Sequence, residues 1–157
     1  MKLSSGWEQG VYVLLILSLL PEKRAMSSLA LADRLKVSPS YLKKIIKSLV
    51  NENLVKSSPG KNGGFSLKRN LTDITFYDVF TAIEGRGRVF ESQHLLANFL
   101  DLPQSETTVC AVSTALTALE ISLMETMSKF KLSQMLKDNQ TNYDLSNLTN
   151  WIAEHVN

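Results

Sequence analysis

Residues 27–64, SSLALADRLKVSPSYLKKIIKSLVNENLVKSSPGKNGG, contain the stretch that decides the fold. Ser28 is expected to cap a first short helix, because a serine side chain accepts hydrogen bonds from the free amides at a helix start. Ser38 followed by Pro39 marks a second start, since proline suits the first helical position. Val37 occupies the turn between the two helices. This spacing predicts a helix-turn-helix.

The second of these helices has two faces of opposite character. Apolar residues at helical spacing are expected to face the core, namely Leu42, Ile45, Ile46 and Leu49. The opposite face carries small polar and basic residues, namely Ser40, Lys43, Lys44, Lys47 and Asn51. Three lysines on a short, well-capped second helix are typical of a helix that lies in the major groove of DNA.

A β-hairpin is predicted directly after the two helices. Residues 54–57 and 65–68 alternate apolar and polar side chains, as half-buried strands do. Between them, Gly63 and Gly64 permit a tight turn and a close approach to a phosphate backbone. The predicted fold is a winged helix-turn-helix, mainly α with a small β-hairpin, joined to a long dimerisation helix.

The remaining segments are mostly expected to be helical. A first helix over 7–20 is apolar on most sides, which indicates that it is sandwiched between two layers, either within the fold or partly against a second subunit. A helix over 74–84 is expected to close the core and to stop at Gly85. Residues 90–100 keep helical spacing. After a polar break at 137–141, a last short helix is expected to be capped by Asp144.

A seam of apolar residues runs along residues 108–130. Its members recur at intervals of three and four, namely Val112, Leu116, Leu119, Leu123, Met127 and Phe130. Such a helix needs a surface to lie against, and a second copy is the economical partner, because helix-turn-helix proteins usually bind two half-sites as dimers. Packing within one subunit is the alternative. We expect a DNA-binding domain over 1–85, a variable effector or linker segment over 86–108, a dimerisation helix over 109–136 and a tail over 137–157.

Charge is distributed unevenly along the 157 residues. The net charge is +2, but residues 1–70 hold 12 Lys or Arg against 4 Asp or Glu, while residues 71–157 hold 5 against 11. A basic half with a helix-turn-helix indicates DNA at one end and another partner at the other.

Several classes of protein are disfavoured by the composition. The single cysteine, Cys110, excludes an intramolecular disulfide framework and fits a reducing compartment. The apolar run 11–20 is too short to span a bilayer, so we expect a cytoplasmic protein without a membrane segment. The two histidines are far apart and no nucleophile lies at motif spacing from a base, so no catalytic site is expected.

The sequence resembles the Rrf family of bacterial winged-helix transcriptional regulators (the IscR, NsrR and CymR type). The resemblance covers residues 1–136 and rests on four stretches: Met1-Lys2-Leu3-Ser4, Ser38-Pro39-Ser40-Tyr41-Leu42, Gly63-Gly64-Phe65-Ser66-Leu67 and Ala82-Ile83-Glu84-Gly85. It implies a homodimer that binds pseudo-palindromic double-stranded DNA and mostly represses, with the long helices crossing at the dimer interface.

Two features depart from the family pattern. Cluster-binding members carry three closely spaced cysteines before the long helix, whereas residues 84–109 contain none and only Cys110 follows. One thiol does not supply the several protein ligands that an iron–sulfur cluster takes, so neither a cluster nor another metal is expected. Many members also carry an arginine before the wing glycines, where this chain has Pro59, which leaves Lys61 as the available cation.

The candidate site residues follow from these patterns. DNA contact is expected from Ser28, Ser38, Ser40, Tyr41, Lys43, Lys44, Lys47, Lys56, Lys61, Gly63 and Gly64. For Ser38 the alternative role is capping alone, and for Tyr41 it is packing. Cys110 is expected at the start of the long helix, where the helix dipole favours a thiolate, so it is a candidate redox switch, with a structural cysteine as the alternative.

Two functions from different classes fit the sequence. The first is a dimeric transcriptional regulator that binds a specific DNA sequence and acts as a repressor. Its effector would be a small molecule, a regulatory protein or a thiol modification. The second is a protein-interaction module, or a regulator controlled by an enzyme partner that docks on the acidic carboxy-terminal half. The retained lysine face of the second helix favours the first, because a protein that no longer binds DNA has no use for it.

Overall fold

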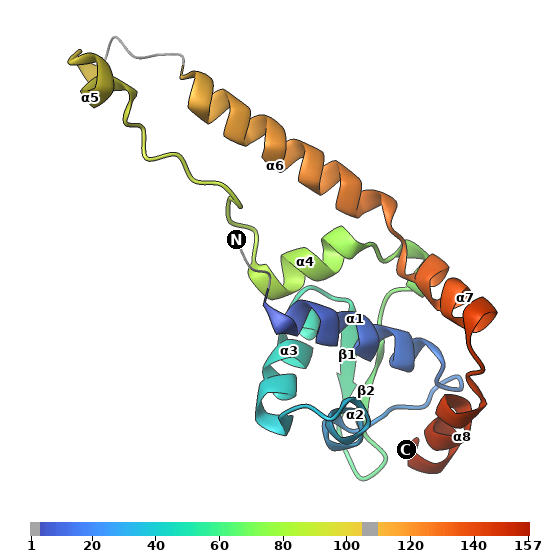
Figure 1. Ribbon diagram of the computed structural model, residues 1–157. Coiled ribbons are helices and arrows are strands. Elements are labelled where there is room, and N and C mark those ends of the chain that lie inside the picture. The colour runs from blue at the N-terminus through green and yellow to red at the C-terminus, as the bar shows by residue number, and fades with distance from the viewer. Residues whose placement is uncertain (1–3, 105–109) are drawn as a thin grey trace.

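The computed structural model describes residues 4–104 and 110–157 and consists of a helical body with a projecting arm (Figure 1). The described elements are α1 (Ser5–Ser18), α2 (Ser28–Leu35), α3 (Pro39–Asn51), β1 (Val55–Ser58), β2 (Gly64–Leu67), the 3₁₀ turn η1 (Leu71–Asp73), α4 (Phe76–Glu84), α5 (Leu96–Leu100), α6 (Ala111–Lys129), α7 (Leu132–Asn142) and α8 (Ser146–His155). The arm is α6 together with the segment from residue 85 to 104, which runs along it in the opposite direction (Figure 1). The fold class is therefore as predicted.

The body is built around α1. This helix contacts α3, α4, β2 and α7, and its residues Val13 and Leu14 are fully buried. The chain therefore covers α1 on several sides, whereas Tyr12 is 45% exposed and lines a hollow together with Val11 and Leu15. The helix begins at Ser5 and ends at Ser18, two residues earlier at each end than predicted, and Pro21 follows the turn that ends it.

The two helices of the helix-turn-helix differ in how well their starts were predicted. Ser27, not Ser28, caps α2, because its hydroxyl oxygen accepts a hydrogen bond from the amide of Ala30 at 3.1 Å. Ser28 is instead the first helical residue and is buried, with 9% of its surface exposed. Helix α3 begins at Pro39 after the cap Ser38, as predicted.

The wing is an antiparallel hairpin whose register pairs Val55 with Leu67 and Ser58 with Gly64. Both strands lie one residue nearer the tip than predicted. The segment before α2 extends this sheet, because Met26 and Phe65 exchange two main-chain hydrogen bonds of 3.0 and 2.9 Å. The wing is therefore attached to the body along β2.

Gly64 is required at the point where this attachment is made. Its φ is +145°, and a Cβ atom added there would lie 2.6 Å from the carbonyl oxygen of Met26. We expect Gly64→Ala to lower the free energy of unfolding by about 1–3 kcal/mol, because the backbone is strained and the Met26 pairing must shift. Denaturant unfolding measures this, with Gly87→Ala as the control, since a Cβ at Gly87 meets nothing within 4 Å. Equal stability of the two variants would contradict the prediction.

Helix α4 begins at Phe76, two residues later than predicted, because Thr75 is its cap. The Thr75 amide donates to Asp78 Oδ2 at 2.8 Å while the Asp78 amide donates to the Thr75 hydroxyl at 3.2 Å, which forms a capping box. Arg69 binds Asp78 Oδ1 at 2.9 Å. Burial alone would raise the pKa of Asp78, but the hydrogen bonds from Thr75 and Arg69 outweigh it and lower that pKa. Gly85 ends α4, as predicted.

The arm joins the body through a short antiparallel pairing. The amide of Phe76 donates to the Phe130 carbonyl at 2.9 Å, and the amide of Leu132 donates to the Ile74 carbonyl at 3.0 Å. This pairing ends α6 at Lys129, and α7 begins only at Leu132. The prediction of a single helix over 109–136 is therefore wrong. The predicted start of that helix near Thr108 lies outside the described residues.

The segment that returns along the arm is mostly not helical. The amide of Val89 donates to the buried carboxylate of Glu120 at 2.7 Å, and the hydroxyls of Ser92 and Ser113 are 2.8 Å apart. These bonds hold the segment extended against α6. Only residues 96–100 of the helix predicted over 90–100 are helical, because His94 has a left-handed φ of +54°.

The carboxy-terminal residues form two helices instead of one. The polar break predicted at 137–141 lies inside α7, which is fixed to the body by the fully buried Leu132. The predicted cap Asp144 is one residue too early, because Leu145 occupies the cap position of α8; the Asp144 carboxylate instead accepts a hydrogen bond from the Ser146 amide at 2.9 Å. Among the residues described, no helix is long and apolar enough to cross a membrane.

Candidate DNA-binding surface

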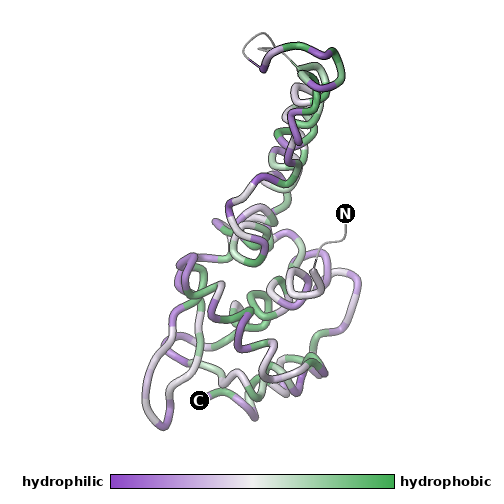
Figure 2. The backbone as a smooth tube through the Cα atoms, turned by 90° about the vertical axis from the view of Figure 1, so that its left-hand side faces the viewer, coloured by the Kyte–Doolittle hydropathy of each residue, from purple (hydrophilic) through white to green (hydrophobic). Residues whose placement is uncertain are grey.

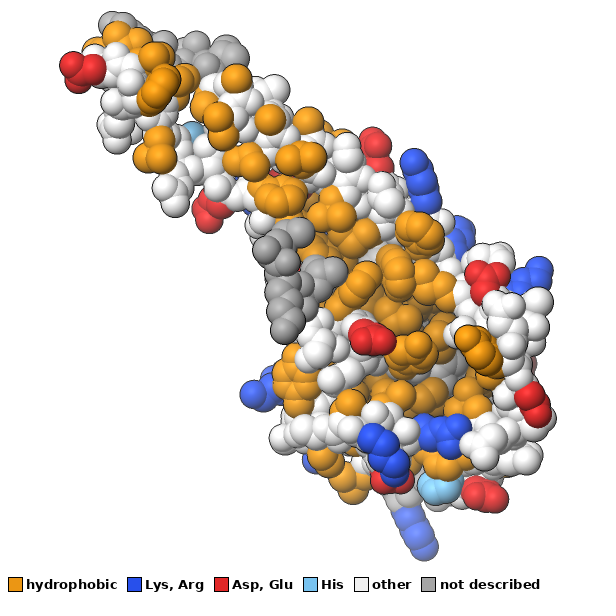
Figure 3. Space-filling view, viewed as in Figure 1, with side chains coloured by type: hydrophobic (Ala, Val, Ile, Leu, Met, Phe, Trp, Pro, Cys, Tyr) orange, Lys and Arg blue, Asp and Glu red, His pale blue; other side chains and the backbone are white. Residues whose placement is uncertain are grey.

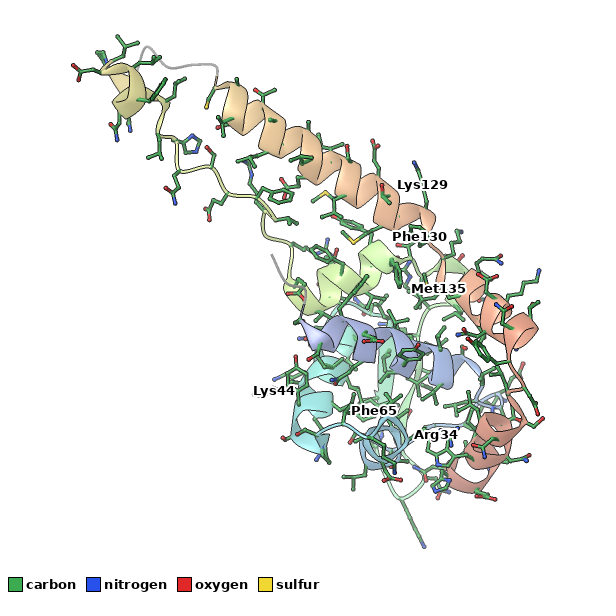
Figure 4. All side chains as sticks on the ribbon, in the orientation of Figure 1. Arg34, Lys44, Phe65, Lys129, Phe130 and Met135 are labelled. Atoms are coloured by element: carbon green, nitrogen blue, oxygen red, sulfur yellow. The ribbon has the colours of Figure 1, made fainter. Side chains whose placement is uncertain are left out.

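The outer face of α3 carries the three predicted lysines. Lys43, Lys44 and Lys47 are exposed, and none forms an ion pair within the described part of the chain. Figure 4 shows Lys44 pointing away from the body. The opposite face of the helix is buried through Leu42, Ile45, Ile46 and Leu49, as predicted. The fold thus presents three uncompensated cations on one rigid helix.

The amino terminus of α3 adds hydroxyl groups to this surface. Ser38 and Ser40 are both exposed, and their hydroxyl oxygens are 3.0 Å apart. The free amides of a helix start and its dipole attract anions such as phosphate, so the two hydroxyls lie where a phosphate would bind. Because the Ser38 oxygen is 3.5 Å from the Tyr41 amide, its capping bond is weak and the hydroxyl remains available.

Tyr41 is oriented differently from the lysines. Its side chain packs against the core, and its hydroxyl lies beside α1: a Cβ added at Gly6 would be 2.9 Å from that oxygen. This orientation favours the packing alternative over a phosphate contact. Ser28 is likewise turned inward, and its burial argues against the predicted DNA contact.

The wing contributes charge at its tip and at its base. Lys61 is exposed at the tip and Lys56 on β1. Lys56 lies with Lys23 and Arg24 around a hollow of about 210 Å³ beside the wing. The proximity of Lys23 to the wing depends on the turn before α2, which local sequence patterns do not predict. A left-handed φ of +59° at Lys23 forms part of that turn.

The two wing glycines have a structural role that sequence reasoning stated only in part. An added Cβ at Gly63 would overlap the carbonyl oxygen of Ser58, and one at Gly64 would overlap Met26. Both residues are therefore needed to form the hairpin and its attachment. Any approach of these glycines to DNA is a consequence of that shape.

The sequence and the fold are similar to those of known proteins. A family model described as Rrf2, iron-dependent transcriptional regulator, matches residues 3–138. The chain belongs to the Rrf2 family. The resemblance seen in the sequence is thereby confirmed, and the protein is a transcriptional regulator of the DNA-binding type and not an enzyme.

Two relatives match nearly the whole chain. The protein YffB of Lactococcus lactis is 62% identical over 154 residues, which is 98% of this chain and 99% of the relative. The protein YwgB of Bacillus subtilis is 38% identical over 156 residues, covering 99% and 97%. Both carry provisional names as HTH-type transcriptional regulators.

Solved structures share the Rrf2 fold with this chain. CymR of B. subtilis, described as the global cysteine regulator, superposes with a TM-score of 0.64 at 20% identity, over 87% of this chain and 97% of CymR. IscR of T. potens gives 0.67 at 23% identity, over 92% of each chain. At these identities the likeness extends to the fold alone.

The residues near the start of α6 do not fit an iron–sulfur cluster. Cys110 is the only cysteine, and within residues 4–104 and 110–157 no three His, Cys, Asp or Glu side chains come together to hold a metal ion. The nearby groove, about 530 Å³ in volume, is lined mainly by apolar side chains, among them Leu95, Leu96, Phe99, Val112 and Leu116. An iron–sulfur cluster needs several thiolate ligands, which this groove does not offer.

Cys110 itself is the residue immediately before α6, one position earlier than predicted. Hydrogen bonds from the amide and hydroxyl of Ser113 lower the pKa of its thiol, and the thiol is only partly buried. A lowered pKa increases the thiolate fraction at neutral pH, and the thiolate is the nucleophilic form.

Proposed function

We propose that this Rrf2 regulator acts as a homodimeric repressor that binds a pseudo-palindromic operator without an iron–sulfur cluster. The observation that carries the proposal is the lysine face of α3, which is exposed, free of ion pairs within the described residues and backed by a buried apolar face. On the same side of the fold, the hydroxyls at the start of α3 supply hydrogen-bond donors for phosphate.

The dimer is supported by those residues of the apolar seam on α6 that no other part of the described chain covers. Val112, Leu119 and Phe130 are 65%, 57% and 51% exposed. Met127 is buried, and Leu116 and Leu123 are partly covered. Figure 3 shows hydrophobic side chains continuing from the arm onto the body. Exposed apolar surface of this extent marks an interaction site. Because two operator half-sites require two DNA-binding domains, a second copy of this chain is the best-suited partner.

The absence of a cluster is supported by the single thiol and the apolar groove beside it. A regulator of this kind binds its operator in a way that does not depend on iron. The repressor action is proposed because the regulators that the sequence resembles mostly repress.

Fluorescence anisotropy with the labelled promoter of the protein's own gene tests the proposal. We expect specific binding that survives excess non-specific DNA, weakens linearly in log–log plots against salt and is unchanged by an iron chelator. In vitro transcription from the same promoter should fall as the protein is added. Binding lost on chelation would refute the cluster-free form, and increased transcription would refute repression.

We further propose that Cys110 gives this regulator a response to oxidants. Cys110 is the residue before α6 and lines the groove between residues 91–99 and that helix. Oxidation of its thiol would therefore change the lining of this groove. We expect a mild peroxide treatment to lower operator affinity of the parent several-fold and to leave Cys110→Ser unaffected, since the variant has no thiol to oxidise. Mass spectrometry of the treated parent identifies the modification. Equal responses of parent and variant would place the oxidant effect elsewhere.

A further inference from the structure

Helix α8, which lies beyond the residues matched by the family model, is part of the DNA-binding body. Its Ile152 is 3% exposed and belongs to the same core cluster as the buried residues of α1, α2 and α3. Leu148 and Trp151 pack against that cluster. The end of the chain is therefore folded onto the helix-turn-helix, on the side away from the arm (Figure 1).

One set of contacts joins α8 to α2. The Arg34 guanidinium lies 5.2 Å from the centre of the Trp151 ring, within range of a cation–π interaction. Its Nη2 also donates to Asn147 Oδ1 at 3.1 Å. These contacts fix α8 on the first helix of the helix-turn-helix and thereby orient the residues that follow it.

A second set joins the residues after α8 to the wing. The amide of Asn157 donates to the Ala25 carbonyl at 2.8 Å, next to the Met26–Phe65 pairing that attaches β2. The side-chain amide nitrogen of Asn157 donates to the Gly63 carbonyl, also at 2.8 Å. Figures 1 and 2 both place the C-terminal end beside the hairpin. Asn157 thus joins the wing tip at Gly63 to the segment before α2 at Ala25.

We propose that Asn157 is a positioning residue for DNA binding, which holds the wing tip in the orientation in which Lys61 meets the phosphate backbone. An isolated two-stranded hairpin is only marginally stable in water, so its tip needs an external support to keep one orientation. A wing that is already oriented loses less conformational freedom on binding, and this raises affinity without a new DNA contact. The inference rests on the DNA contact proposed for the wing.

The test compares Asn157→Ala with Asn150→Ala, which removes the same side chain from an exposed position of α8. On the operator we expect Asn157→Ala to weaken binding about three- to tenfold, which corresponds to the net contribution of about one hydrogen bond, and Asn150→Ala to bind like the parent. Because Asn157 acts through Lys61, the pair Asn157→Ala/Lys61→Ala should bind no more weakly than Lys61→Ala alone. Independent, additive losses would overturn the proposal.

Hydrogen–deuterium exchange on the free protein separates this inference from the proposed function. We expect faster exchange over residues 60–64 in Asn157→Ala than in the parent or in Asn150→Ala, with the other elements unchanged. Unchanged exchange at the wing would overturn the positioning role, whatever the DNA result. Faster exchange in a protein that binds no operator would instead refute the proposed function and leave the support of the wing by Asn157 in place.

Discussion

Replacing Lys43 and Lys47 together by alanine is expected to lower operator affinity by about 100-fold or more. In a dimer the change removes four exposed cations, and each charge-assisted contact to phosphate or guanine is worth on the order of 1 kcal/mol or more. The slope of log affinity against log salt should become shallower by about 0.9 for each phosphate that the variant no longer neutralises. Anisotropy titrations across a salt series measure both quantities.

The matched control removes two lysines far from α3. Lys129→Ala/Lys137→Ala makes the same change in net charge, but these residues lie at the end of α6 and on α7 (Figure 4 labels Lys129). We expect at most a small, salt-dependent loss in the control. If the two double variants lost affinity equally, the attraction would arise from overall charge, and α3 would not be the reading helix.

Leu119→Glu is expected to convert the dimer to a monomer at micromolar concentration. The Leu119 side chain is exposed in one protomer. In a dimer interface, glutamate at this position would bury a carboxylate without a partner, which costs several kcal/mol. Sedimentation equilibrium gives the mass directly. Operator affinity should fall at the same time, because a monomer binds one half-site without the gain from linking two.

Ile121→Glu provides the control for the dimer prediction. Ile121 is also exposed, at 50%, but two residues along the helix place it about 160° around α6 from Leu119. This variant should remain dimeric. A dimeric Leu119→Glu protein would show that the apolar seam packs elsewhere, and a monomeric Ile121→Glu protein would show that the opposite face of α6 is the interface.

Local signals predicted the parts of the fold in which a few neighbouring residues decide the structure. Ser38 and Pro39 located the start of α3, and Gly85 the end of α4, because capping and backbone freedom act within one turn. Ser28 was predicted as the cap of α2, but its neighbour Ser27, which has the same side chain, forms the cap. Which of the two serines caps α2 depends on where the helix must begin for Leu31 and Ala32 to face the core. That position is determined by the packing of the whole core.

Long-range contacts were not accessible in the same way. Residues 90–100 keep helical spacing, yet hydrogen bonds to Ser113 and Glu120 on α6 hold the part of this segment before α5 in a non-helical conformation. The sequence predicted a last short helix, but no local pattern indicates that its residues Leu148, Trp151 and Ile152 pack against the helix-turn-helix. Consequently the support of the wing by Asn157 could be found only from the folded chain.

The junction between arm and body has a consequence for the DNA sequences that such a dimer can recognise. Two main-chain hydrogen bonds at residues 74–76 and 130–132 fix the angle at which α6 leaves the body. A helix of 19 residues is about 28 Å long, and half-sites one helical turn apart are separated by roughly 34 Å. In the proposed dimer, the length of α6 and the way it joins the body would contribute to the distance between the two α3 helices, and therefore to the permitted spacing between operator half-sites.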